Sequence, residues 1–135
     1  MLFRLVVVAV VSLLVTACGA DGVEPSISFD GEVCSSSDPS KWPSGAPDIL
    51  VSNNTTGRTA VVMGTYSDGY GHGDLVAYGS DVSTRPDFIN ALEIFEVAPE
   101  SSSNLLFDHG PGRYFMTCLP ETNTMVVLDD VTIDN

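Results

Sequence analysis

Short apolar runs broken by turn-forming residues restrict this chain to a fold made of strands. The runs are rich in Val, Ile, Phe and Tyr, and clusters of Gly, Pro, Asn and Ser separate them. Segments of this length and composition are typical of strands, and their close spacing predicts an all-β Greek-key β-sandwich. The expected strands are Ser26–Phe29, Asp48–Ser52, Thr59–Tyr66, Leu92–Val97, Leu105–Phe107, Gly112–Leu119 and Met125–Ile133.

Two details refine this expectation. A short helix is predicted at 74–78, because Asp74 can cap its first turn and Gly79 can end it. The pair Asp129-Asp130 interrupts the last apolar run, which predicts a bulge or an edge position where both charges face water.

The N-terminus differs from the rest of the chain. A basic residue, Arg4, precedes the apolar run Leu5–Val15, a pattern that is typical of an export signal. The run is shorter than the about 20 residues that a membrane-spanning helix needs, which disfavours a transmembrane anchor. We therefore expect residues 1–17 to be a signal peptide.

The sequence Val15-Thr16-Ala17-Cys18 resembles the lipobox of bacterial lipoproteins. The resemblance implies a diacylglycerol on the sulfur of Cys18, and anchoring by two or more acyl chains is effectively permanent. It divides the chain into a signal peptide (1–17), a lipidated Cys with its tether (18–25) and a sandwich domain (26–135). The expected location is the extracytoplasmic face of the cell envelope, on the outer membrane if the cell has two membranes.

The chain has three cysteines, an odd number for an exported protein. With Cys18 assigned to lipid, Cys34 and Cys118 remain, and we expect them to form a disulfide in a compartment that permits one. Strand alternation points Cys118 into the core. A free thiol or a metal ligand is the competing interpretation of these two residues.

Acidic residues outnumber basic ones by 18 to 5, which gives a formal net charge of -13. A chain this acidic repels phosphate backbones, which disfavours sequence-independent binding to nucleic acid, and we expect no nucleic-acid partner. The length of 135 residues leaves room for one domain and excludes a large multidomain enzyme. Contact with the membrane is expected through the lipid anchor.

Two segments are similar to the cupredoxin family, the Greek-key sandwiches that include the blue-copper electron carriers. Residues 44–54 have that family's glycine turn, apolar strand and corner, the last formed by Asn53-Asn54. In the family, a copper-binding His follows five residues after the second Asn. Thr59 stands at that position here. The resemblance implies a cupredoxin-like sandwich.

The second segment, 112–121, resembles the family's Gly-x-Tyr-x-x-x-Cys strand. By this resemblance Cys118 matches the copper thiolate, Glu121 the second His and Met125 the axial Met. A type-1 copper centre needs two imidazoles and one thiolate, so we expect no type-1 copper and no other cofactor. His72 or His109 stays open as a substitute imidazole if Cys118 is unpaired.

The loop 68–74 is the best alternative site for a metal. Asp68, His72 and Asp74 offer two carboxylates and an imidazole among three glycines. Oxygen ligands would favour Ca²⁺, and participation of His72 would favour Zn²⁺ or Cu²⁺. The competing interpretation is a strand-to-helix connection with Asp74 as the helix cap.

No catalytic constellation is recognised. Asp108 and His109 are adjacent and would point to opposite faces of a strand, and no Ser lies in a nucleophile-elbow pattern. We expect a lipid-anchored extracytoplasmic binding or interaction module, with an envelope protein as its partner, rather than an enzyme. A metal-binding protein using the 68–74 loop and a copper electron carrier are the alternatives.

Overall fold

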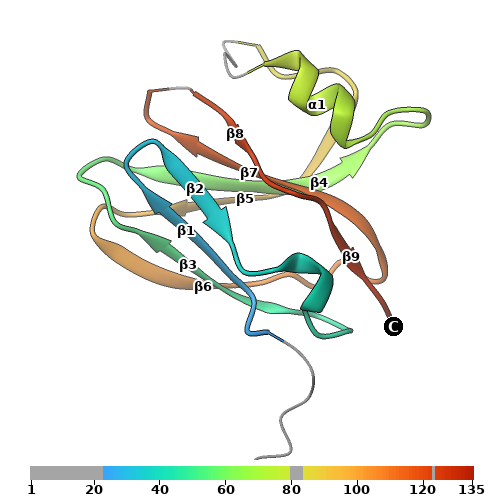
Figure 1. The fold of residues 1–135 in the computed structure, drawn as a ribbon, viewed down its shortest axis with the longest axis horizontal. Helices are drawn as coiled ribbons and strands as arrows, with labels where there is room; N and C mark the ends of the chain where they lie inside the picture. Colours follow the sequence, from blue (N-terminus) through green and yellow to red (C-terminus); the bar gives the residue numbers. More distant parts are fainter. Residues whose placement is uncertain (1–22, 80–83, 123) are drawn as a thin grey trace, which may run out of the picture.

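The computed structural model describes residues 23–79, 84–122 and 124–135 and shows two β-sheets packed face to face (Figure 1). The expected signal peptide and Cys18 lie outside the described residues. Within these residues, no helix has the length and apolar character needed to cross a membrane.

The first sheet has the strand order β2-β1-β3-β6. β1 and β3 are parallel neighbours, and the pairs β1/β2 and β3/β6 are antiparallel. A short 3₁₀ turn, Pro39–Lys41, follows β2. The strands of this sheet are β1 (Ser26–Asp30), β2 (Val33–Ser36), β3 (Asp48–Asn53) and β6 (Ser101–Leu106).

The second sheet has the order β5-β4-β7-β8, and β9 pairs with the opposite end of β7. The chain crosses between the sheets after β3, β5 and β6, so neighbours in space are often distant in sequence. The predicted all-β Greek-key sandwich is therefore confirmed. The strands of this sheet are β4 (Thr59–Tyr66), β5 (Ile89–Val97), β7 (Gly112–Pro120), β8 (Val126–Val127) and β9 (Val131–Ile133).

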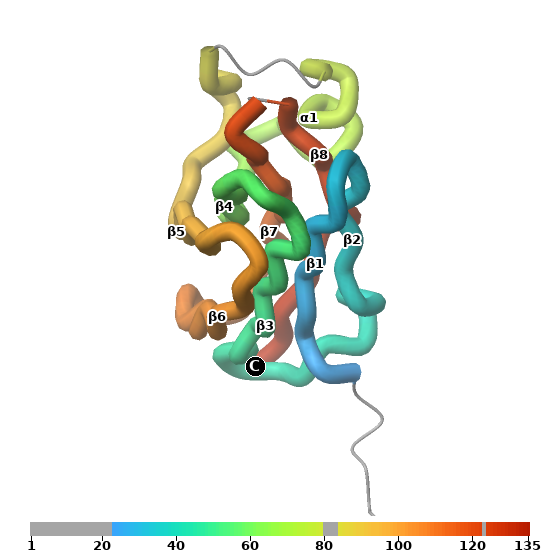
Figure 2. Tube along the Cα trace, turned by 90° about the vertical axis from the view of Figure 1, so that its left-hand side faces the viewer, coloured from blue at the N-terminus to red at the C-terminus, as the bar shows by residue number. Residues whose placement is uncertain are grey.

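The main core lies between the sheets, where alternate residues of each strand point inward. Ile49 and Val51 of β3 face Val61 and Met63 of β4, and all four are almost completely buried. A smaller core lies on the outer face of the second sheet, beneath the helix α1 (His72–Tyr78). Figure 2 shows α1 at the top of the molecule and the beginning of β1 at the bottom.

Strand positions agree with the sequence prediction where the apolar pattern is strong, as in β4. β6 begins at Ser101, four residues before the predicted start, because its serines pair in register with β3. The serine-rich strand β2 was not predicted at all. The single predicted helix is confirmed, but it begins at His72. Asp74 is the third residue of the helix, and its carboxylate caps the helix by accepting a hydrogen bond from Gly71 N (2.9 Å).

The expectation for Asp129 and Asp130 is wrong in one respect. The two residues do interrupt the last run, which splits into β8 and β9. Asp129 is exposed, but the side chain of Asp130 is only 5% exposed. Hydrogen bonds described below offset the cost of burying this carboxylate.

Candidate functional site

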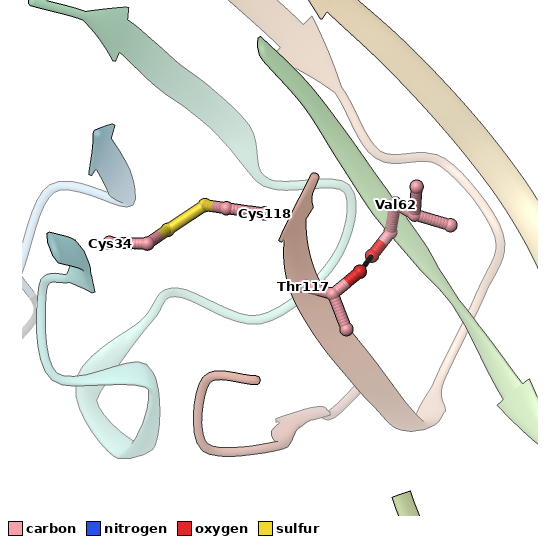
Figure 3. The surroundings of a disulfide bond; sticks show 4 residues. All are labelled: Cys34, Val62, Thr117 and Cys118. Atoms are coloured by element: carbon pink, nitrogen blue, oxygen red, sulfur yellow. Dashed lines mark hydrogen bonds between the residues drawn. A yellow bond between two sulfur atoms is a disulfide. The ribbon is translucent and has the colours of Figure 1, made fainter. Parts of the chain in front are cut away.

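A disulfide joins Cys34 of β2 to Cys118 of β7, as the cysteine count predicts (Figure 3). It links the two sheets across the core, and the two Cα atoms lie 6.3 Å apart. Neighbouring Thr117 points to the other side of β7, where its hydroxyl donates to the carbonyl of Val62 (3.2 Å). Cys118 itself is completely buried and points inward as expected.

The positions that match the family's copper ligands lie in different surroundings. Thr59 is buried at the beginning of β4, opposite Pro120, and its hydroxyl has no hydrogen-bond partner among the described residues. Glu121 is exposed in the turn after β7. Met125 belongs to the smaller core under α1, on the opposite face of the second sheet from Cys118.

These residues do not fit a type-1 copper ion. The sulfur of Cys118 is bonded to Cys34, and the other two equatorial positions hold a hydroxyl and a carboxylate instead of imidazoles. Neither His72 nor His109 replaces them, because each lies against a different carboxylate, Asp130 and Glu93 respectively.

A groove of about 720 Å³ opens at the end of the sandwich where β1, β3 and β7 finish. Three turns form its walls: the β1–β2 turn, the β3–β4 loop and the turn that follows β7. Apolar side chains, four threonines and three charged residues line it together, a mixed composition that is common in binding sites. The lining residues are Phe29, Gly31, Glu32, Thr55, Thr56, Gly57, Arg58, Pro120, Glu121, Thr122, Thr124 and Val126.

Asn53 holds the β3–β4 wall of the groove in place. Its amide nitrogen donates to the carbonyls of Gly57 (2.8 Å) and Val97 (3.1 Å). Its amide oxygen accepts from the backbone N–H (3.1 Å) and the hydroxyl (2.7 Å) of Thr55. Because Asn53 is only 1% exposed, this network fixes the loop from within the protein. The sequence identified the corner but not its role as a support.

Charges at the groove are exposed. Arg58 Nη1 lies 3.9 Å from Glu96 Oε2, and both side chains are about two-thirds exposed, so solvent screens the pair. Glu121 Oε2 lies next to Gly57, where an added Cβ would approach it to 3.1 Å. The side chains that line the groove therefore include both a cation and carboxylates.

The 68–74 loop does not assemble the metal site that its sequence suggests. Asp74 is engaged with Gly71 N, while His72 Nδ1 lies 3.4 Å from Asp130 Oδ1. Among the described residues, no group of three or more His, Cys, Asp or Glu side chains could hold a metal ion. The loop has the geometry of a strand-to-helix connection.

Asp130 organises a polar cluster that the sequence did not reveal. Its carboxylate accepts from the hydroxyl of Tyr66 (2.7 Å) and from Nε of Arg113 (2.9 Å). Burial, followed by the hydrogen bond to Asp130, raises the pKa of Tyr66 far above its ordinary value. The available signal was an aspartate inside an apolar run, but nothing in the sequence identified its partners.

Comparisons with known proteins find little. No protein-family model matches the chain, and no curated protein matches it. Among solved structures, the chain is similar to a sodium-dithionite-reduced auracyanin from the photosynthetic bacterium Roseiflexus castenholzii, with 19% identity and a TM-score of 0.47. That match covers 82% of this chain and 95% of the other.

Proposed function

We propose that this protein is a lipid-anchored, extracytoplasmic binding module whose ligand site is the groove at the end of the sandwich. The observation that carries the proposal is a groove of about 720 Å³ walled by three turns. One of these turns is fixed by the buried hydrogen bonds of Asn53. A site whose walls are fixed before binding loses less entropy when a ligand arrives.

The position of the groove supports this proposal. β1 and β3 run parallel, and both end at the groove. The described part of the chain enters β1 from the opposite end (Figure 2). If Cys18 carries lipid, the groove faces away from the membrane and is open to soluble or neighbouring envelope molecules.

The lining indicates what kind of ligand fits. Threonine hydroxyls donate and accept hydrogen bonds without charge, and Phe29 and Val126 add apolar surface. Arg58 shares the lining with two carboxylates, Glu32 and Glu121, so the charge around the groove is mixed. This chemistry favours the surface of a polar, uncharged or zwitterionic partner over a polyanion.

Site-specific photo-crosslinking in intact cells tests the proposal. A photoreactive residue at Thr56 or Thr122, both exposed at the groove, should give a discrete crosslinked species in the envelope fraction. The control is Ile94, which is 62% exposed on β5 outside the groove. The same species from Ile94, or none from either groove position, would refute a ligand site at the groove.

The anchor is tested separately. Cys18→Ala should move the protein from the membrane fraction to the soluble fraction, because the acyl chains have no other attachment point in this proposal. Cys34→Ala serves as the control, since it removes a cysteine without removing the acylation site. Retention of the Cys18→Ala protein in membranes would contradict lipid anchoring.

Calorimetric titration separates the binding module from the metal-handling alternatives. We expect no heat of binding on addition of Ca²⁺, Zn²⁺ or Cu²⁺ at micromolar protein concentration. Saturable binding that Asp68→Asn or His72→Ala abolishes would instead establish a metal site in the 68–74 loop. Intense visible absorption after copper loading of reduced protein would establish the electron carrier.

A further inference from the structure

The four edges of the two sheets differ in how they are protected from pairing with another chain. Natural sheet edges are usually kept short, charged, bulged or interrupted. β2 is short, with four residues. β5 contains a bulge opposite Met63/Gly64 and carries Glu93 and Glu96. At the β8–β9 edge, two very short strands are separated by a segment that contains Asp129 and Asp130.

β6 has none of these protections. Its six residues, Ser101–Leu106, include no charged residue and no proline. They pair with β3 in one continuous register without a bulge. Among the strands in the described parts of the chain, β3 alone pairs with β6.

The direction of the unpaired backbone groups follows from the register. Phe107 N donates to Pro47 O (2.9 Å), so these opposed residues form a hydrogen-bonded pair. Hydrogen-bonded and non-hydrogen-bonded pairs alternate along an antiparallel ladder. The N–H and C=O groups that point away from β3 therefore belong to Ser102, Asn104 and Leu106. Leu106 is also 59% exposed.

The charge around this edge specifies the partner. Between Arg85 and Arg113 the sequence contains no Lys or Arg. Glu100 and Asp108 flank β6 at its two ends, and the whole chain carries a formal net charge of -13. Two copies of such a chain repel each other, whereas a segment with basic residues at its ends is attracted.

We infer that the outer edge of β6 is a strand-addition site for an extended, basic segment of a partner protein. The segment pairs its backbone with Ser102, Asn104 and Leu106 and places Lys or Arg beside Glu100 and Asp108. Main-chain hydrogen bonds supply affinity in this mode of recognition, and the flanking charges select the partner.

Amide hydrogen exchange on the intact protein tests the inference. The probe is the peptide acetyl-Lys-Val-Thr-Val-Thr-Val-Lys-amide, and its counterpart with Glu in place of both Lys is the charge control. The Lys peptide should slow exchange at the amides of Ser102, Asn104 and Leu106 at least tenfold. Unchanged exchange at millimolar Lys peptide, or equal slowing by the Glu peptide, would overturn the inference.

Asn104→Pro removes one outward N–H and leaves the pairs with β3 intact, as edge-strand prolines do. It should weaken binding of the Lys peptide at least tenfold, whereas the Asn104→Ala protein, which keeps the N–H, should bind the peptide normally.

A version of the Lys peptide with N-methylated backbone positions should also fail to bind. This experiment uses the unaltered protein, so it does not depend on a variant that folds. Normal binding of the methylated peptide would contradict strand addition. If the same amides are protected without peptide, and the protection increases with protein concentration, then a second copy of this chain occupies the edge and the inference is overturned.

Discussion

A buried polar side chain stabilises a fold only when its hydrogen bonds are made, and Asn53 makes them through both its amide nitrogen and its amide oxygen. Three carbonyls, of Gly57, Val97 and Ala98, accept from its amide nitrogen. These contacts connect the β3–β4 loop to the end of β5. The residue therefore acts on the groove without lying in its surface.

Asn53→Ala should lower the free energy of unfolding by about 2–3 kcal/mol, because it leaves buried carbonyls without a donor. Its neighbour Asn54 is exposed, and Asn54→Ala should change stability by less than about 0.5 kcal/mol. Urea denaturation of the two variants measures both values. Equal stability of the pair would show that the Asn53 network contributes nothing.

The half-buried phenol of Tyr66 makes the stability of the fold depend on pH in the alkaline range. Its pKa is raised in the folded state, by burial first and by Asp130 second, from an ordinary value of 10.0. Above about pH 10 the unfolded chain loses this proton while the folded chain keeps it, so the unfolded state is favoured. The contribution of Tyr66 is fully present below pH 10 and decreases as the pH rises further.

Tyr66→Phe should therefore flatten the loss of stability between about pH 9 and pH 11. Urea denaturation across that range measures the slope. Tyr70→Phe is the matched control, because Tyr70 is 50% exposed and makes no contact with Asp130 in the described structure. An equally steep loss in the Tyr66→Phe variant would contradict this account.

At the scale of elements, the bulge in β5 depends on a glycine in the neighbouring strand. An added Cβ at Gly64 would overlap the backbone carbonyl of Asn90. Gly73, in the first turn of α1, has open space around the corresponding position. The backbone packing at Gly64 therefore leaves no room for a side chain, whereas the surroundings of Gly73 do.

Gly64→Ala should destabilise the protein by about 2–3 kcal/mol, because backbone must move to admit the methyl group. Gly73→Ala should stabilise it by about 0.5–1 kcal/mol, since Ala loses less backbone entropy in a helix. Thermal or urea denaturation of both variants tests the difference in sign. A tolerated Gly64→Ala would mean that β4 and β5 lie further apart than described.

Two of the predicted strands share one property. β4 and β7 have near-continuous apolar runs, and both lie in the middle of their sheet, where burial selects the side chains. β2 and β6 lie at sheet edges, where serine is tolerated. A prediction from β-propensity therefore misses β2 and makes β6 too short. The groove was not predictable, because its walls come from turns that only the tertiary fold brings together. The lipobox and the anchor stay predictions.

At the scale of the whole molecule, the Cys34–Cys118 disulfide connects an edge strand of one sheet to a central strand of the other. It closes a loop with a sequence separation of 84 residues. A cross-link over a long loop restricts the unfolded chain strongly in the entropy model. The cysteine count predicted this pair because Cys18 was assigned elsewhere.

The double variant Cys34→Ser/Cys118→Ser should be less stable by about 3–5 kcal/mol in urea denaturation. Thiol labelling of unreduced, native protein should modify neither position, because both sulfurs are bonded. The reduced wild-type protein should match the double variant in stability. Labelling of both cysteines without reductant would contradict the disulfide.

The parallel pairing of β1 and β3 has a mechanical consequence. β1 is the first described strand after the expected tether, and it lies between β2 and β3 inside its sheet. A pulling force that acts along the axis of β1 at its first residue loads the hydrogen bonds on both sides of the strand together instead of opening them one by one. If Cys18 carries lipid as proposed, β1 therefore resists being pulled out of its sheet when a force acts on the far end of the domain.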